Sequence, residues 1–179
     1  MLLTATNETL IQWGEVNLTP LQKASDIQAR IAAELQRIDA VGRLNEAKDA
    51  AMGVSKGFFD RFAQKKPDTY EFKLQESKRD LLKLMSESDR QMKGFLPEVR
   101  DLHLDGLALS VVIGEYQDAV LMNIGNSRLK TLLLAHQTGT MLMTVLENTV
   151  QQCAQYIEQI DSMLSVTIPQ WKLALQNKP

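Results

Sequence analysis

The chain has 179 residues, of which 44% are hydrophobic and 23% charged, and its net charge is −2. This composition is typical of a folded globular chain that needs no disulfide or metal to hold its core. The near balance of charge disfavours binding to nucleic acid, because it provides no field for a phosphate backbone. The single cysteine, Cys153, rules out an intramolecular disulfide and suits a reducing compartment.

The N-terminus has no basic segment followed by an apolar run, and no stretch approaches the ~20 apolar residues of a membrane span. We therefore expect a cytoplasmic protein, with peripheral contact at the inner membrane face as the alternative location. Residues 1–19 are expected to form an N-terminal arm or short helix, and residues 20–179 a helical bundle domain.

The first long helix is predicted from Pro20 into the 47–51 region, with Thr19 as its N-cap. Ile27, Ile31 and Leu35 follow at helical spacing and define one apolar face. Gly53 and the residues after it are expected to loosen the chain.

An aromatic and basic patch lies between this helix and the next. Two readings stay open: a short connecting helix whose rings fill the bundle, which we favour, or an amphipathic surface that lies on an anionic membrane. The patch consists of Phe58, Phe59, Arg61, Phe62, Lys65 and Lys66.

Two further helices are predicted in the middle of the chain. The first starts at Pro67–Asp68 and ends or kinks near Phe95, because Gly94 and Pro97 interrupt the helical pattern. The second is the most apolar segment, runs from Glu98 or Gly106 to Asn123, and should stop at Gly125–Asn126.

The last segment has the clearest pattern, an apolar heptad seam with steps of three and four. It predicts one helix ~60 Å long, at 1.5 Å per residue. The seam positions are Leu129, Leu132, His136, Gly139, Met143, Leu146, Val150, Cys153, Ile157, Ile160, Leu164 and Thr167. The expected class is therefore all-α: an elongated antiparallel helical bundle with one long C-terminal heptad helix.

Candidate chemistry is sparse. In Asp101–Asp105, His103 lies between two carboxylates, but residues two apart on a helix point away from each other, so a polar loop or helix start is the favoured reading. His136 and Cys153 fall on the seam and are expected to be buried core residues, since no basic side chain lies one turn from Cys153. We expect no catalytic residue, cofactor or metal, and hence no enzyme.

Pro169 should kink or end the long helix, because it lacks a donor and clashes with the carbonyl of Ser165. Trp171 brings a large apolar surface to that corner, which favours docking of the tail onto the bundle.

The segment Val166-Thr167-Ile168-Pro169-Gln170-Trp171-Lys172 resembles the toxic-anion-resistance (TelA-like, tellurite resistance) family, which carries a similar Thr-Ile-Pro-x-Trp-Lys stretch. A looser likeness begins at Phe58-Phe59-Asp60-Arg61-Phe62. Members of that family are longer than this chain. The resemblance implies helical architecture and a bacterial stress or resistance setting, and Pro169, Trp171 and Lys172 match its motif.

Together these observations predict a helical interaction or scaffold protein that acts by self-association or partner binding, with tellurite resistance as its setting. The expected interaction residues are Leu146, Val150, Ile157, Ile160, Leu164, Pro169, Trp171 and Lys172. One alternative is a membrane-binding helical protein that uses Leu107–Ile113 and the Phe58–Lys66 patch. A third is a thiol-dependent detoxifying enzyme that uses Cys153.

Overall fold

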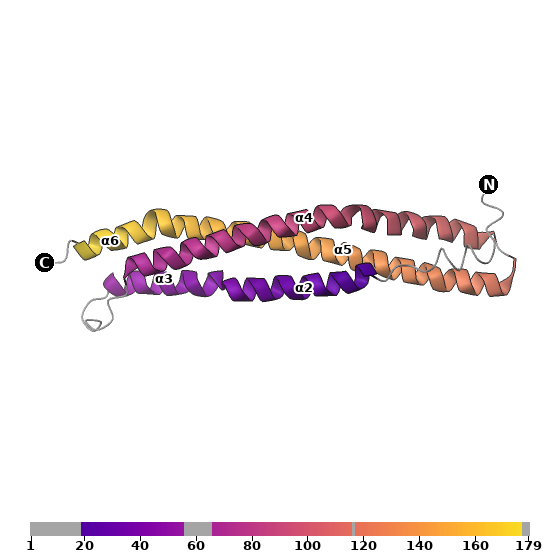
Figure 1. Ribbon diagram of the computed structural model, residues 1–179, viewed down its shortest axis with the longest axis horizontal. Helices are drawn as coiled ribbons and strands as arrows, with labels where there is room; N and C mark the ends of the chain where they lie inside the picture. The colour runs from indigo at the N-terminus through magenta and orange to yellow at the C-terminus, as the bar shows by residue number, and fades with distance from the viewer. Residues whose placement is uncertain (1–18, 56–65, 116, 177–179) are drawn as a thin grey trace. The chain divides into compact units, whose positions relative to one another are not determined.

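The computed structural model describes residues 19–55, 66–115 and 117–176, and these are helical almost throughout, with no strand among them. The all-α prediction is confirmed. The helices in these ranges are α2 (Thr19–Ile38), α3 (Ala40–Ser55), α4 (Pro67–Gly114), α5 (Ala119–Ser162), the π-helical turn η1 (Met163–Thr167) and α6 (Ile168–Gln176) (Figure 1). Residues 1–18 of the predicted arm, and Phe58, Phe59, Arg61, Phe62 and Lys65 of the patch, lie outside the described residues.

The described residues form two compact units. Unit 1 contains residues 19–29 and 90–147, and unit 2 contains residues 30–89 and 148–176. Helices α2, α4 and α5 each contribute residues to both units.

In unit 2, α4 runs antiparallel to its neighbours, because its residues pair in reverse order with theirs. From α2 and α3 to α4 the ion pairs are Arg30–Glu87, Arg37–Asp80, Arg43–Glu76 and Glu46–Lys73. Lys78 of α4 pairs with Asp161 of α5 at 2.5 Å. The core between the helices includes Leu74, Leu81 and Ile160, each fully buried. Unit 2 is thus a bundle of packed helices.

The predicted first helix is interrupted at Asp39, which corrects the expected continuous span. Asp39 has a positive φ of 45°, a conformation that Asp tolerates better than most side chains. Its carboxylate accepts a hydrogen bond from the Gly42 N–H at 3.2 Å and so caps α3. A Cβ at residue 42 would lie 2.3 Å from Asp39 Oδ2, so the cap requires glycine there.

The predicted helix end near Phe95 is also wrong, because α4 continues through Pro97 to Gly114. Pro97 removes the hydrogen bond to the carbonyl of Lys93, a change that costs about 3 kcal/mol in an isolated helix. Both Gly94 and Pro97 are exposed, so water can satisfy that carbonyl. Packing along the rest of α4 holds the helix together across this weak point.

The chain reverses between the end of α4 at Gly114 and the start of α5 at Ala119, and not at Gly125–Asn126. Asp118 caps α5, since its Oδ1 accepts a hydrogen bond from the Val120 N–H at 2.7 Å. Gly125 lies inside α5, buried against Ile113, and a Cβ there would come within 2.7 Å of Ile113 Cγ1. This glycine permits close packing of α4 and α5 and does not end a helix.

Five of the twelve predicted seam positions are buried as expected, and the other seven are half-buried. The buried seam positions seven residues apart are Leu132, Gly139, Leu146, Cys153 and Ile160. At three of the alternate seam positions the buried residue is the one just before the predicted one. Buried there are Ala135, Leu142 and Thr149, whereas the predicted His136, Met143 and Val150 are half-buried. Near Thr149, in unit 2, Gln152 and Tyr156 of α5 line one cavity with Leu35 of α2. The face of α5 next to Thr149 therefore packs toward α2 as well as α4.

Pro169 neither ends nor sharply interrupts the long helix. The turn before it widens into η1, where the Ile168 N–H donates to the carbonyl of Met163, five residues earlier. A wide turn relieves the clash between the proline ring and the preceding carbonyls. Ser165 Oγ also donates to the carbonyl of Asp161 at 2.7 Å. The helical segment therefore continues to Gln176, beyond the point at which the sequence analysis expected it to kink or end.

Candidate interaction surface

In unit 1, α4 and α5 form a helical hairpin around a small apolar core. Leu109 and Ile113 of α4 pack with Leu132 of α5, and the half-buried Leu102 and Leu129 extend this cluster. The core positions of α4 alternate at steps of three and four, so one face of the helix is fully used against α5.

The opposite face of α4 in unit 1 is also apolar, and no described residue covers it. Leu104 and Leu107 are each 52% exposed, and Val111 is 69% exposed. Their spacing of three and four residues places them on one face. A helix that is apolar on both sides is expected to be buried on both sides, and a bare apolar face typically marks a contact site. We call Leu104, Leu107 and Val111 the α4 stripe.

Helix α5 adds apolar surface in the same unit. Its exposed apolar side chains are Val120, Met122, Leu133, Leu134 and Met141. Threonine hydroxyls in this part of α5 donate hydrogen bonds within the helix. Each donates to the carbonyl four residues earlier, at 2.9–3.2 Å, in Thr131, Thr138, Thr140 and Thr144. The hydroxyl groups therefore present little unsatisfied polarity to a partner.

His103 and His136 face each other across the hairpin, with ring centroids 4.9 Å apart and ring planes at 35°. His103 is exposed in the interior of α4, which corrects the expected loop or helix start, and His136 is half-buried. Sequence reasoning missed this pair, because the predicted break at Gly125 placed the two histidines in unrelated helices. Within the described ranges, no group of three or more His, Cys, Asp and Glu residues could hold a metal ion.

The structure places most of the predicted interaction residues inside the chain. Leu146, Ile160 and Trp171 are buried, and Val150, Ile157 and Leu164 are half-buried. Pro169 is exposed. The long seam is therefore largely covered by the chain itself and offers little surface to a second molecule.

The corner around Trp171 docks onto the first turn of α4, in agreement with the favoured reading. The Trp171 ring packs on Tyr70, with centroids 5.6 Å apart. Lys172 Nζ lies 2.8 Å from Asp68 Oδ1 and 2.5 Å from Glu71 Oε2. These hydrogen bonds, first to Asp68 and then to Glu71, raise the pKa of Lys172 above its ordinary value. Trp171 Nε1 is buried and has no hydrogen-bond partner among the described residues.

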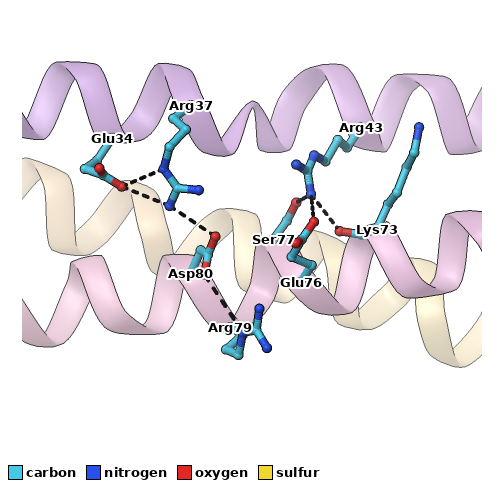
Figure 2. Close-up of polar contacts among 8 residues, drawn as sticks. All are labelled: Glu34, Arg37, Arg43, Lys73, Glu76, Ser77, Arg79 and Asp80. Carbon is cyan, nitrogen blue, oxygen red and sulfur yellow. Dashed lines mark hydrogen bonds and ion pairs between the residues drawn. The ribbon is translucent and has the colours of Figure 1, made fainter.

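Arg43 is the best-connected polar side chain between α3 and α4 (Figure 2). Its Nη1 donates to Glu76 Oε2 at 2.9 Å, to Ser77 Oγ at 3.1 Å and to the carbonyl of Lys73 at 3.2 Å. Ser77 is itself buried, so Arg43 satisfies a polar group inside the bundle. This arrangement fixes how α3 lies on α4 and shows no site for a substrate.

Arg37 joins α2 to α4 in the same close-up (Figure 2). It bonds Glu34 on its own helix and Asp80 on α4. The hydrogen bond to Glu34, followed by that to Asp80, raises the pKa of Arg37 further above its usual range. Arg37 is therefore a fixed positive charge of the helix packing.

Cys153 is fully buried, as predicted. Burial raises the pKa of its thiol to about 11, so the thiol is protonated at neutral pH. A cavity of about 170 Å³ lies nearby, at the α2–α3 break. It is lined by Leu35, Asp39, Ala40, Val41, Leu81, Gln152 and Tyr156, and Cys153 is not among them. The geometry therefore gives no support to thiol catalysis.

No family model, curated protein or solved structure matches this chain. Among the described residues, the helices are not apolar over a sufficient length to cross a membrane.

Proposed function

We propose that this chain is a helical interaction protein that acts by binding a second protein surface, through the α4 stripe of unit 1. The observation that carries the proposal is the apolar character of α4 on two opposite faces, with α5 on one and no described residue on the other. Burying three such side chains is favourable by roughly 25 cal/mol for each Å² of apolar area removed from water.

This proposal keeps the predicted type of function and moves its surface. The sequence favoured the 146–164 seam, whose strongest apolar members are buried within the chain. The α4 stripe is exposed, and Leu107 and Val111 belong to the segment that the sequence analysis named in its membrane-binding alternative.

A membrane surface is the second candidate, because residues 106–127 contain only two charged side chains, Glu115 and Asp118. Both are acidic, so an anionic membrane would repel this end of the hairpin. A protein surface therefore suits the α4 stripe better. Flotation with anionic and zwitterionic vesicles separates the two, since a protein-binding stripe predicts that the chain stays at the bottom of the gradient with both.

The setting of the proposed function comes from the resemblance at Thr167–Lys172, which makes tellurite tolerance the first phenotype to measure. A strain that lacks the protein should lose tolerance, and the wild-type chain should restore it. Leu107→Asp should fail to restore it, whereas Phe72→Asp should succeed. Phe72 is 68% exposed in unit 2 and serves as the matched control. Unchanged tolerance in the deletion strain would remove this setting, and equal rescue by both variants would remove the role of the stripe.

A further inference from the structure

We propose that the α4 stripe binds the α4 stripe of a second copy of this chain, with the two helices antiparallel. The proposal rests on the proposed function and names the partner for the same surface. It follows from the symmetry of the stripe and from the charges at its two ends.

The α4 stripe is complementary to itself when one copy is reversed. In an antiparallel pair centred near Leu107, Leu104 of one copy lies opposite Val111 of the other, and Leu107 lies at the centre. A two-fold pair of this kind uses the same surface on both molecules, so each contact occurs twice. The three exposed side chains thus form one continuous apolar layer with their symmetry mates.

Two side chains of opposite charge, Arg100 and Glu115, flank the α4 stripe. Arg100 lies four residues before Leu104, and Glu115 lies four residues after Val111. Both are exposed, and the Arg100 side chain is 72% exposed, 3.7 Å from its neighbour Asp101. In the antiparallel arrangement, Arg100 of one copy comes within about one helical turn of Glu115 of the other. A parallel arrangement would place Arg100 beside Arg100 and Glu115 beside Glu115, which is unfavourable.

The size of the surface predicts a weak pair. Stable protein interfaces bury about 800 Å² on each partner, and a stripe of three side chains is smaller than that. We therefore expect a dimer that forms and dissociates with concentration. Because charges at the rim act through complementarity, reversal of one sign should have a clear effect on this equilibrium.

The test is a set of charge reversals in the full chain, with dimerisation followed by sedimentation velocity over a concentration series. Arg100→Glu alone and Glu115→Arg alone should each raise the dimer dissociation constant by about tenfold, a change equal to ~1.4 kcal/mol. The double variant should restore dimerisation toward the wild-type value, because each copy again meets an opposite charge. Circular dichroism on the same samples verifies that the exposed substitutions leave the helices intact.

Each other outcome overturns the proposal in a distinguishable way. If neither charge reversal changes the dimer but Leu107→Asp dissociates it, the antiparallel pairing is wrong and the proposed function stands. If the wild-type chain stays monomeric at every concentration, the second copy is not the occupant. If that monomer floats with vesicles in a manner that requires Leu107, the occupant is a lipid surface and the proposed function fails as well.

Discussion

Gly139 of α5 lies directly against Val99 of α4, and a Cβ added to the glycine would sit 2.7 Å from Val99 Cγ2. The two helices of the unit 1 hairpin approach closely here because residue 139 has no side chain. Gly94 of α4, unlike the buried Gly139, is exposed, and a Cβ there would meet nothing within 4 Å. The two glycines therefore form a matched pair for testing how the hairpin packs.

Gly139→Ala should lower the free energy of unfolding by about 1–3 kcal/mol, because the added methyl group forces the helices apart. Gly94→Ala should raise it by about 0.5–1 kcal/mol, since alanine has the higher helix propensity. Urea unfolding monitored by circular dichroism measures both. A gain in stability from Gly139→Ala would contradict the close approach.

The three hydrogen bonds of Arg43 predict that its replacement is costly. Arg43→Lys cannot keep all of them and should lower the free energy of unfolding by about 1–2 kcal/mol. Arg30→Lys is the control, because the Arg30 side chain is 60% exposed and lies 3.5 Å from Glu87. Arg30→Lys should lower the free energy of unfolding by less than ~0.5 kcal/mol. If Arg43→Lys and Arg30→Lys lowered the stability equally in thermal unfolding, Arg43 would have no special role.

Cys153 should resist thiol reagents in the folded chain. Its raised pKa and full burial predict that an aromatic disulfide reagent at pH 8 reacts far more slowly than with the urea-unfolded chain. Cys153→Ser should cost about 1–3 kcal/mol, because a hydroxyl would be buried in its place. Rapid stoichiometric labelling of the native chain would mean that α5 is not packed as described.

The Lys172 contacts predict an alkaline dependence of stability. A lysine whose folded-state pKa is raised stabilises the fold fully below its unfolded pKa, and this contribution is lost as pH rises through the folded value. The stability difference between wild type and Lys172→Gln should thus be constant near neutral pH and shrink in strongly alkaline solution. Lys48→Gln, at an exposed lysine of α3, should show no such trend. Unfolding curves at pH 7–12 provide the comparison.

The sequence predicts the class of fold well, because apolar residues at steps of three and four mark helices regardless of which neighbour covers them. It predicts the interruptions poorly. Pro97, Pro169 and Gly125 all suggested breaks, yet the helices continue. Pro97 is exposed, Pro169 follows a π turn, and Gly125 lies where α4 and α5 approach closely. The break at Asp39 was missed because it depends on a single cap with Gly42.

The candidate surface could be anticipated only in part. The apolar run at Leu107–Ile113 was visible in the sequence, but half of it packs on α5 and half is bare, as Leu109 and Val111 show. Which residues are bare depends on where the chain turns. The sequence placed that turn at Gly125, whereas α4 ends at Gly114 and α5 begins at Ala119. The His103–His136 pair was hidden for the same reason.

The solution mass of the full chain, measured by light scattering over a range of concentrations, tests the central claim most directly. An interaction surface of the proposed kind predicts a mass that rises from 20.2 kDa toward twice that value, with Leu107→Asp holding the chain at the lower mass and Phe72→Asp behaving as wild type. A constant monomer mass at all concentrations, or a dimer that Leu107→Asp leaves unchanged, would contradict the assignment of self-association to the α4 stripe.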